Sequence, residues 1–233
     1  MKTIGIVGGL AWPSTAEYYR LINQEVSRLM GGSGRHCAKL VLAQTDFDAV
    51  ERAQAADDWD AVAALIAEQV NILKAAGADF YIIACNTVHK AMPRIEAASD
   101  LPYIHIADPA AQACVDAGYK TVGLMGSGYT MGSTYFTGRL ENKYGLSVLL
   151  PDEAQREFMQ RALYGELVKG VFLSETRAGF SAVIDGLARR GAQAVILGCT
   201  EFGLLVGRAD SALPLIDTAR EHAKAAAIMA VKG

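Results

Sequence analysis

The feature of this sequence that most limits its fold is an internal repeat. Three short segments of the first half recur in the second half in the same order. They are 3–9 (TIGIVGG) with 121–127 (TVGLMGS), 77–85 with 191–199, and 101–104 (LPYI) with 213–216 (LPLI). The second and third pairs are displaced by 114 and 112 residues. Segments that recur in order at nearly constant spacing indicate a duplicated structural unit.

Each copy of the repeat alternates two kinds of segment. Short β-branched runs that end at glycine or polar residues alternate with longer Ala/Leu/Glu-rich stretches of helical period, which is typical of a parallel sheet with crossover helices. The predicted strands are 3–7, 39–43, 80–84, 103–106, 121–125, 147–150, 194–197 and 215–216. The predicted helices include 14–30, 59–76, 155–169 and 174–190.

These elements predict an α/β protein of two pseudo-symmetric Rossmann-like lobes, each a parallel sheet flanked by helices. The first lobe is expected to contain residues 1–104 plus 212–233, and the second residues 105–211. Ligands of such sheets bind beyond the carboxyl ends of the strands. We therefore expect the active site in the cleft between the two lobes.

Composition favours a small-molecule partner. The chain has 233 residues, of which 52% are hydrophobic, and a formal net charge of −3. It can bury a sizeable core, and it offers no basic field for nucleic acid or an anionic membrane. The first apolar run turns early at Gly8 and Gly9, and no run approaches the roughly 20 apolar residues that span a bilayer. We expect a cytoplasmic protein without nucleic-acid or membrane partners, whose four cysteines stay reduced.

Two of the cysteines occupy equivalent points of the repeat. Cys85 follows the apolar run YIIA, and Cys199 follows VILG, each at an expected strand-to-helix turn. A single cysteine is often a small, inert core residue. Two cysteines at matching positions, each followed by polar residues, instead favour a reactive pair. Cys37 and Cys114 have no repeat partner, and we expect them to be structural.

A pair of thiols across one cleft suits racemisation at a carbon atom. This reaction removes a proton from one face and returns a proton to the opposite face, so it needs two acid/base groups. The unperturbed pKa of a thiol, about 8.5, lies close to working pH, and helix N-termini stabilise thiolates. Cys85 and Cys199 would then titrate as a coupled pair.

The residues around the cysteines fit an amino-acid substrate. Its α-carboxylate gains charge as the proton leaves, and hydrogen-bond donors at helix starts are natural receptors for that charge. The candidate donors are Asn86, Thr87, Ser127, Thr130 and Thr200. Helix capping is the alternative role for each of them.

Two further patterns, at Gly8-Gly9 and at Cys85 with His89, resemble parts of nucleotide or metal sites. Gly8-Gly9 is not continued as Gly-x-Gly-x-x-Gly, so Gly9 is expected to bring the backbone close to a small ligand or to form a tight turn. His89 lies four residues after Cys85, but the second half has no matching histidine, so we expect no metal. His89 is interpreted as a supporting residue beside Cys85 or as an ordinary buried histidine.

Three motifs resemble those of a known family. They are Gly8-Gly9 with Ser14-Thr15 and Tyr18-Tyr19, then Cys85–His89 (CNTVH), and Gly198–Glu201 (GCTE). Over nearly its whole length the sequence resembles the aspartate/glutamate racemases, which share a superfamily with hydantoin racemases and maleate isomerases. The resemblance implies a two-lobed fold, racemisation without pyridoxal phosphate, metal or other cofactor, and a homodimer. A cysteine at position 85 implies activity toward both enantiomers, because family members with threonine there act on one.

The resemblance also bears on the substrate. Lys169 falls where aspartate racemases place a lysine that holds the substrate's side-chain carboxylate, although a lysine at a helix end is also favoured by the helix dipole. Some aspartate racemases carry an arginine after the second strand, where this chain has the stretch that begins at Gln44. Aspartate is therefore the preferred substrate, with glutamate or a broader range as alternatives. We expect Trp12 to wall the pocket or to pack in the core, and Gln44 and Glu201 to support the site.

Two other functions remain open at this point. A maleate-type cis–trans isomerase would use one cysteine as a nucleophile toward an alkene. A non-catalytic amino-acid-binding protein would need neither thiol, so the equivalent positions of Cys85 and Cys199 argue against it.

Overall fold

The computed structural model describes all residues from 1 to 233. The chain forms two compact units, which are treated separately below. Unit 1 contains residues 1–106 and 222–233, and unit 2 contains residues 107–221. The polypeptide therefore passes from one unit to the other twice, after Ile106 and after Glu221.

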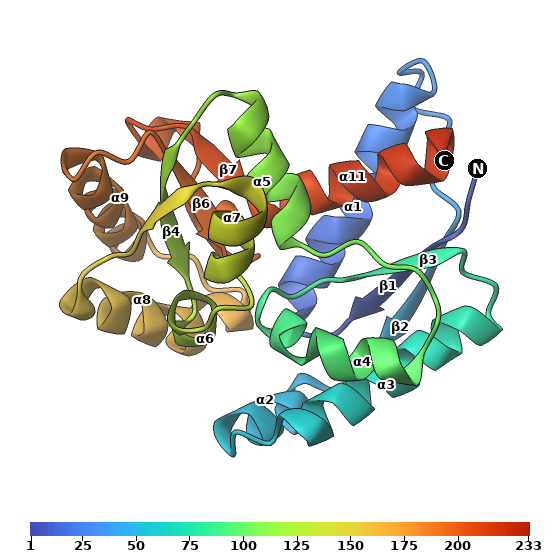
Figure 1. Cartoon of the computed structure of the whole chain (residues 1–233). Coiled ribbons are helices and arrows are strands. Elements are labelled where there is room, and N and C mark those ends of the chain that lie inside the picture. Colours follow the sequence, from blue (N-terminus) through green and yellow to red (C-terminus); the bar gives the residue numbers. More distant parts are fainter. The chain divides into compact units, whose positions relative to one another are not determined.

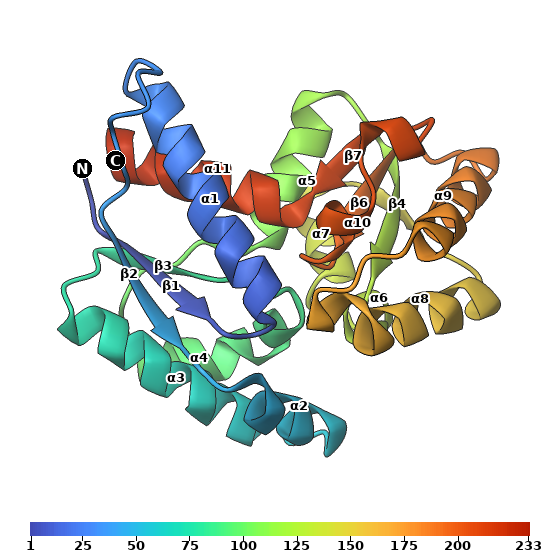
Figure 2. The same cartoon turned by 180° about the vertical axis from the view of Figure 1, so that it is seen from behind.

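Unit 1 is built on a three-stranded parallel sheet. Its strands are β1 (Ile4–Gly8), β2 (Leu40–Gln44) and β3 (Phe80–Ile83), in the order β2-β1-β3. Its helical elements are α1 (Trp12–Leu29), α2 (Phe47–Ala55), α3 (Trp59–Ala75), the 3₁₀ turn η1 (Thr87–Ala91), α4 (Met92–Ala98) and most of α11 (Thr218–Lys232). Helices α1 and α11 cover one side of this sheet, and α3 and α4 lie on the other (Figures 1 and 2).

Local sequence explains these elements. Every residue of β1 and β3 is buried, as expected for parallel strands whose two faces are covered by helices. Helix α1 has Pro13 in its first turn, where the missing N–H has no intrahelical partner to lose. Asp58 caps α3 by accepting a hydrogen bond of 2.9 Å from the Ala61 N–H.

Unit 2 contains a four-stranded parallel sheet. Its strands are β4 (Thr121–Gly126), β5 (Ser147–Leu149), β6 (Ala194–Gly198) and β7 (Leu215–Asp217), in the order β5-β4-β6-β7. Its helical elements are α5 (Ala107–Asp116), α6 (Gly128–Gly132), α7 (Thr137–Tyr144), α8 (Glu153–Gly165), η2 (Leu167–Lys169), α9 (Ser174–Arg189), α10 (Phe202–Leu205) and η3 (Arg208–Asp210). Asp152 and Gln155 begin α8 with a reciprocal capping box.

The internal repeat is visible in matching hydrogen bonds. The Tyr81 N–H donates to the Pro102 carbonyl at 2.8 Å, and in unit 2 the Val195 N–H donates to the Pro214 carbonyl at 2.9 Å. The first residue of each repeat also donates its N–H to a side chain. Thr3 donates to the Asp79 carboxylate, and Thr121 donates to the Gln193 amide oxygen. The predicted α/β architecture of two parallel sheets flanked by helices is confirmed.

One predicted strand does not form. Residues 103–106 were expected to be a strand, but only Tyr103 makes an isolated bridge, to Tyr81. The reason is that the next backbone groups bind histidine side chains: the Ile104 carbonyl accepts from His222, and the Ile106 N–H donates to His89. The equivalent segment in unit 2 continues as β7.

Two other bounds differ from the prediction. The helix expected over 155–169 ends at Gly165, and residues 167–169 form the separate turn η2, which is closed by Gly170 in the left-handed region at φ 77°. Residues 212–221 group with unit 2, because β7 pairs with β6.

The two ends of the chain meet in unit 1. The Lys2 N–H donates to the Ala230 carbonyl at 2.8 Å, and the N and C marks lie together in both views (Figures 1 and 2). None of the helices combines the length and the apolar character that a membrane crossing requires.

Candidate active site

The predicted residues of unit 1 lie at one edge of its sheet. Parallel strands end at the same edge, and the chain leaves β1 at Gly9, β2 at Gln44 and β3 just before Cys85. Cys85 is partly buried, and Asn86 and Thr87 are buried beside it. The carboxyl edge expected to bind a ligand therefore carries these candidates together.

Gly9 makes the turn from β1 to α1. Its φ is 78°, and a Cβ atom there would lie 2.1 Å from the Thr45 carbonyl oxygen. Its N–H donates to the Thr15 hydroxyl at 3.0 Å. Turn formation therefore explains this glycine. Trp12, which follows the turn, is 63% exposed and is not part of the core.

The Cys85 turn is held by the residue four positions later. The Asn86 carbonyl, just before η1, accepts a hydrogen bond of 3.1 Å from the His89 N–H. The His89 ring reaches back and donates from Nδ1 to the Cys85 carbonyl at 2.8 Å. His89 thus contacts the backbone of Cys85, and this nitrogen is not directed to a metal ion.

The predicted residues of unit 2 gather at the matching edge of the second sheet. Strand β4 leads to Ser127 and Thr130, and β6 leads to Cys199, which is 7% exposed. Buried Thr200 donates to a carboxylate oxygen of buried Glu201 at 3.2 Å. Cys199 is thus followed by a hydroxyl and a carboxylate, whereas Cys85 is followed by the amide of Asn86 and the hydroxyl of Thr87.

Ser127 and Thr130 are bound to each other. The Ser127 hydroxyl accepts from the Thr130 N–H at 3.2 Å and so caps α6, and the Thr130 hydroxyl lies 3.0 Å from that of Tyr135. Both side chains are buried. The capping role considered from the sequence is therefore present for Ser127.

Two glycines bring the strand ends close together just before Cys199. Gly126 and Gly198 are partners across β4 and β6. A Cβ atom at Gly198 would lie 3.0 Å from the Met125 carbonyl oxygen, and one at Gly126 would lie 3.2 Å from the Gly198 carbonyl oxygen. The absence of side chains here lets the backbone set the position of the Cys199 turn.

Lys169 is separate in sequence from these turns. It is the last residue of η2, and its side chain is exposed. A lysine side chain carries a strongly hydrated ammonium group on a flexible four-carbon stem.

The remaining two cysteines differ from each other. Cys114 is fully buried on α5, where burial, with the charge of Glu221, raises the pKa of its thiol to about 12. Cys114 is therefore a neutral packing residue. Cys37 is exposed in the segment between α1 and β2, so its expected structural role is wrong, because an exposed side chain fills no core.

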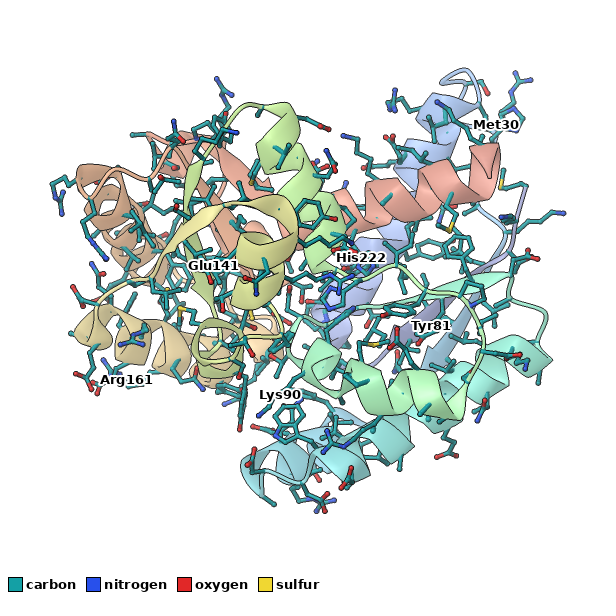
Figure 3. All side chains as sticks on the ribbon, viewed as in Figure 1. Met30, Tyr81, Lys90, Glu141, Arg161 and His222 are labelled. Carbon is teal, nitrogen blue, oxygen red and sulfur yellow. The ribbon has the colours of Figure 1, made fainter.

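A cluster of histidines in unit 1 was missed from the sequence. His89, His105 and His222 are all buried, with ring centroids 4.7 Å apart for His89–His105 and 6.1 Å for His89–His222. Figure 3 marks His222 on α11. No spacing rule links these three positions, so the sequence carried no signal for the cluster.

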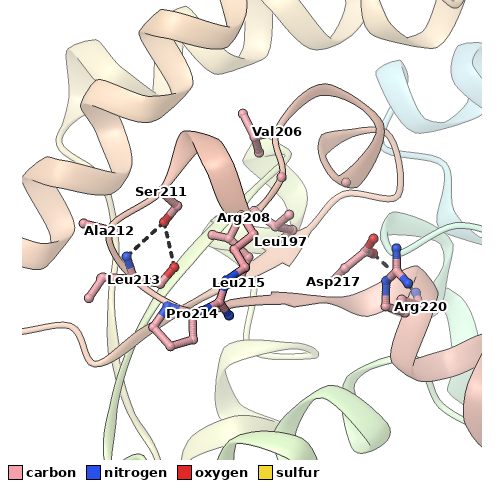
Figure 4. A pocket seen from close by; sticks show the side chains of 12 residues that line it. Leu197, Val206, Arg208, Ser211, Ala212, Leu213, Pro214, Leu215, Asp217 and Arg220 are labelled. Carbon is pink, nitrogen blue, oxygen red and sulfur yellow. Dashed lines mark hydrogen bonds between the residues drawn. The ribbon is translucent and has the colours of Figure 1, made fainter.

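A pocket of about 480 Å³ lies beside the Cys199 turn without including it. Its walls come from β6, β7, α10 and the segment between them, and include Leu197, Gly203, Val206, Leu213, Asp217 and Arg220 (Figure 4). Asp217 turns its carboxylate to the Ala219 N–H at the start of α11, and Ser211 binds the backbone of Leu213. These polar groups are thus engaged in holding the local fold.

Comparison with known proteins agrees with this arrangement. The family model for Asp/Glu/Hydantoin racemase matches residues 7–226. The crystal structure of a proposed Asp/Glu racemase from Yersinia pestis is similar, with 41% identity, full coverage of both chains and a TM-score of 0.89. An aspartate racemase homologue from Pyrococcus horikoshii OT3 has 26% identity, full coverage of both chains and a TM-score of 0.83.

A glutamate racemase isoform from Bacillus anthracis shares the fold at 18% identity, with a TM-score of 0.63 over 98% of this chain and 81% of that chain. The family match spans both sheets and both cysteine turns described above. The chain therefore belongs to the Asp/Glu/hydantoin racemase family.

Proposed function

We propose that this protein interconverts L- and D-aspartate by cofactor-independent proton transfer at Cα, with Cys85 and Cys199 as the two acid/base groups. One observation carries the proposal. Each cysteine follows the strand that lies next to the first strand of its repeat, β3 beside β1 and β6 beside β4. The two thiols are thus equivalent points of a duplicated fold in a racemase family.

The proposed reaction needs the two turns to face one substrate. One cysteine, as thiolate, takes the Cα proton, and the other, as thiol, gives a proton to the opposite face. The first thiolate thereby becomes a thiol and the second thiol becomes a thiolate, so charge and protons balance. For the other enantiomer the two roles are exchanged.

The substrate carboxylates require donors on both sides. In the proposal Asn86, Thr87 and Thr200, together with the backbone near Ser127, receive the α-carboxylate, and its growing charge is stabilised in the transition state. Lys169 receives the side-chain carboxylate. Thr130, Gln44, His89 and Glu201 support the turns, and Gly9 and Trp12 border the site.

The preference for aspartate rests on two supports. Lys169 is an exposed cation that a second carboxylate can reach, and the relative from Pyrococcus horikoshii OT3 is described as an aspartate racemase homologue. Glutamate is the competing substrate, since its carboxylate differs by one methylene group. The homodimer implied by the family resemblance stays a prediction, which light scattering of the purified protein tests.

The test is proton exchange in deuterated water. With L- or D-aspartate we expect loss of the Cα proton signal in NMR spectra and a decay of optical rotation to zero, and no exchange with aspartate or glutamate would contradict the proposal. Cys85→Ala and Cys199→Ala should each abolish racemisation, whereas Cys37→Ala, at an exposed cysteine, should keep it. Full activity in either of the first two variants would exclude the two-cysteine mechanism. A covalent adduct with an unsaturated diacid would favour isomerase chemistry instead.

A further inference from the structure

The histidine next to the first cysteine turn has both ring nitrogens in defined hydrogen bonds. Nδ1 of His89 lies 2.8 Å from the Cys85 carbonyl oxygen, which only accepts, and Nε2 lies 3.3 Å from the Ile106 N–H, which only donates. The ring is therefore neutral, with its proton on Nδ1. It links the Cys85 backbone to Ile106 through two directional bonds.

A second histidine also binds this segment. Nε2 of His222 donates to the Ile104 carbonyl at 2.9 Å, and its Nδ1 accepts from the Tyr18 hydroxyl at 2.9 Å. His105 lies between Ile104 and Ile106 in the sequence, and its ring packs against the ring of His89. Residues 104–106 are thus fixed by side chains where a strand was expected.

This segment is where the chain leaves unit 1. Ile106 is the last residue before the chain enters unit 2, and His222 is the first residue after it returns. Both covalent connections between the units therefore start at the histidine cluster. Cys85 is one hydrogen bond away from it.

The second cysteine turn has no histidine at the matching position. With the displacement of 114 residues that relates Cys85 to Cys199, the counterpart of His89 is Gly203. A Cβ atom at Gly203 would lie 2.1 Å from a carboxylate oxygen of Asp217, so this position has no room for a ring. The bond from His89 to the Cys85 carbonyl therefore has no histidine counterpart after Cys199.

We propose that His89 is a positioning residue. It holds the Cys85 turn to residues 104–106, the segment that leads from unit 1 to unit 2, and so fixes the direction of the Cys85 thiol. The proposal rests on the proposed function in taking Cys85 as a reacting group. His89 acts through the Cys85 carbonyl and takes no proton from the substrate.

Two amide substitutions separate the two bonds of His89. The side-chain nitrogen of asparagine occupies nearly the position of Nδ1, so His89→Asn keeps a donor toward the Cys85 carbonyl. The amide of glutamine reaches the position of Nε2, so His89→Gln keeps a partner for Ile106 and loses the bond to Cys85. Tyr18→Phe removes a bond of the same cluster that does not contact Cys85, and serves as the matched control.

The first measurement needs no substrate. Each cysteine is alkylated with iodoacetamide, and the rate at each site is followed by peptide mass spectrometry, with exposed Cys37 as the reference for the reagent and Cys199 as the internal control. We expect His89→Gln to accelerate alkylation of Cys85 at least threefold with Cys199 unchanged. His89→Asn and Tyr18→Phe should keep the wild-type Cys85 rate. An unchanged Cys85 rate in His89→Gln, or equal acceleration of both thiols, would overturn the proposal.

The second measurement uses Cα-deuterated aspartate. In His89→Gln the isotope effect on kcat should rise for one enantiomer only, the one whose proton goes to Cys85, and His89→Asn should restore the wild-type value. Equal changes for both enantiomers would overturn the positioning role. If the wild-type protein exchanges no Cα proton, the proposed function fails, and the alkylation rates still decide the role of His89.

Discussion

The Tyr18 hydroxyl lies 2.9 Å from Nδ1 of His222, although the two residues are 204 positions apart in the chain. Both side chains are completely buried, and their rings meet edge to face with centroids 5.7 Å apart. This contact joins α1 to α11 on one side of the first sheet. It is a structural bond far from either cysteine in sequence.

Tyr18→Phe removes this bond and keeps the ring. The His222 nitrogen is then left as a buried acceptor without its donor, which costs about 1–3 kcal/mol. Urea unfolding followed by circular dichroism measures the loss. Tyr19→Phe is the control, because Tyr19 is the next residue of the same helix and is 57% exposed. Equal stability of the two variants would show that the bond contributes nothing.

Gly9→Ala should be far more damaging than alanine at another glycine of positive φ. At Gly32 φ is 72° and no atom lies within 4 Å of the added Cβ, so Gly32→Ala should cost only the backbone strain of about 1–2 kcal/mol. At Gly9 the same strain is joined by a contact of 2.1 Å with the Thr45 carbonyl oxygen. Thermal unfolding of both variants compares the two effects, and similar melting temperatures would contradict the turn geometry.

An ion pair in unit 2 predicts a loss of stability in acid. Burial would raise the pKa of Asp108, but hydrogen bonds from Arg139 at 2.5 Å and Lys143 at 3.0 Å, together with their charges, lower it overall. A carboxyl whose pKa is lower in the folded state stabilises the protein above its unfolded pKa, and the contribution disappears as the pH falls through the folded pKa.

Asp108→Asn should therefore lower stability at neutral pH and make it less dependent on pH below about 4, near the ordinary pKa of an aspartate. Urea midpoints between neutral and acid pH measure this slope. Asp100→Asn is the control, since Asp100 pairs with Lys74 at the exposed surface and such pairs contribute little. An identical pH slope in wild type and Asp108→Asn would contradict the predicted linkage.

Lys169→Gln should weaken substrate binding without changing the fold. Loss of one hydrogen bond between charged groups costs about 1.5–3 kcal/mol, which corresponds to a KM for aspartate raised at least tenfold. Melting temperature should stay close to the wild-type value, because the side chain is exposed. Lys232→Gln, at the exposed end of α11, is the control for loss of charge alone. An unchanged KM would remove Lys169 from the site.

The sequence predicted what depends on local pattern. Strand ends and cysteine turns follow from apolar runs that stop at glycine or polar residues, and the repeat predicted that Cys85 and Cys199 occupy matching turns. The strand predicted over 103–106 was wrong because backbone groups of this segment bind His89 and His222. His222 is 118 residues away from Ile104, and a partner at that distance cannot be recognised in the local sequence pattern. The placement of side chains from distant helices depends on the whole fold.

Because unit 1 is interrupted by residues 107–221, its assembly is linked to the order in which the polypeptide is synthesised. A nascent chain that has left the ribosome as far as residue 221 already contains all of unit 2, but it lacks His222 and most of α11. Until then Tyr18 and the Ile104 carbonyl have no partner in that helix. Unit 2 can therefore fold first, and the cotranslational folding of unit 1 is complete only when the last turns of α11 have been synthesised.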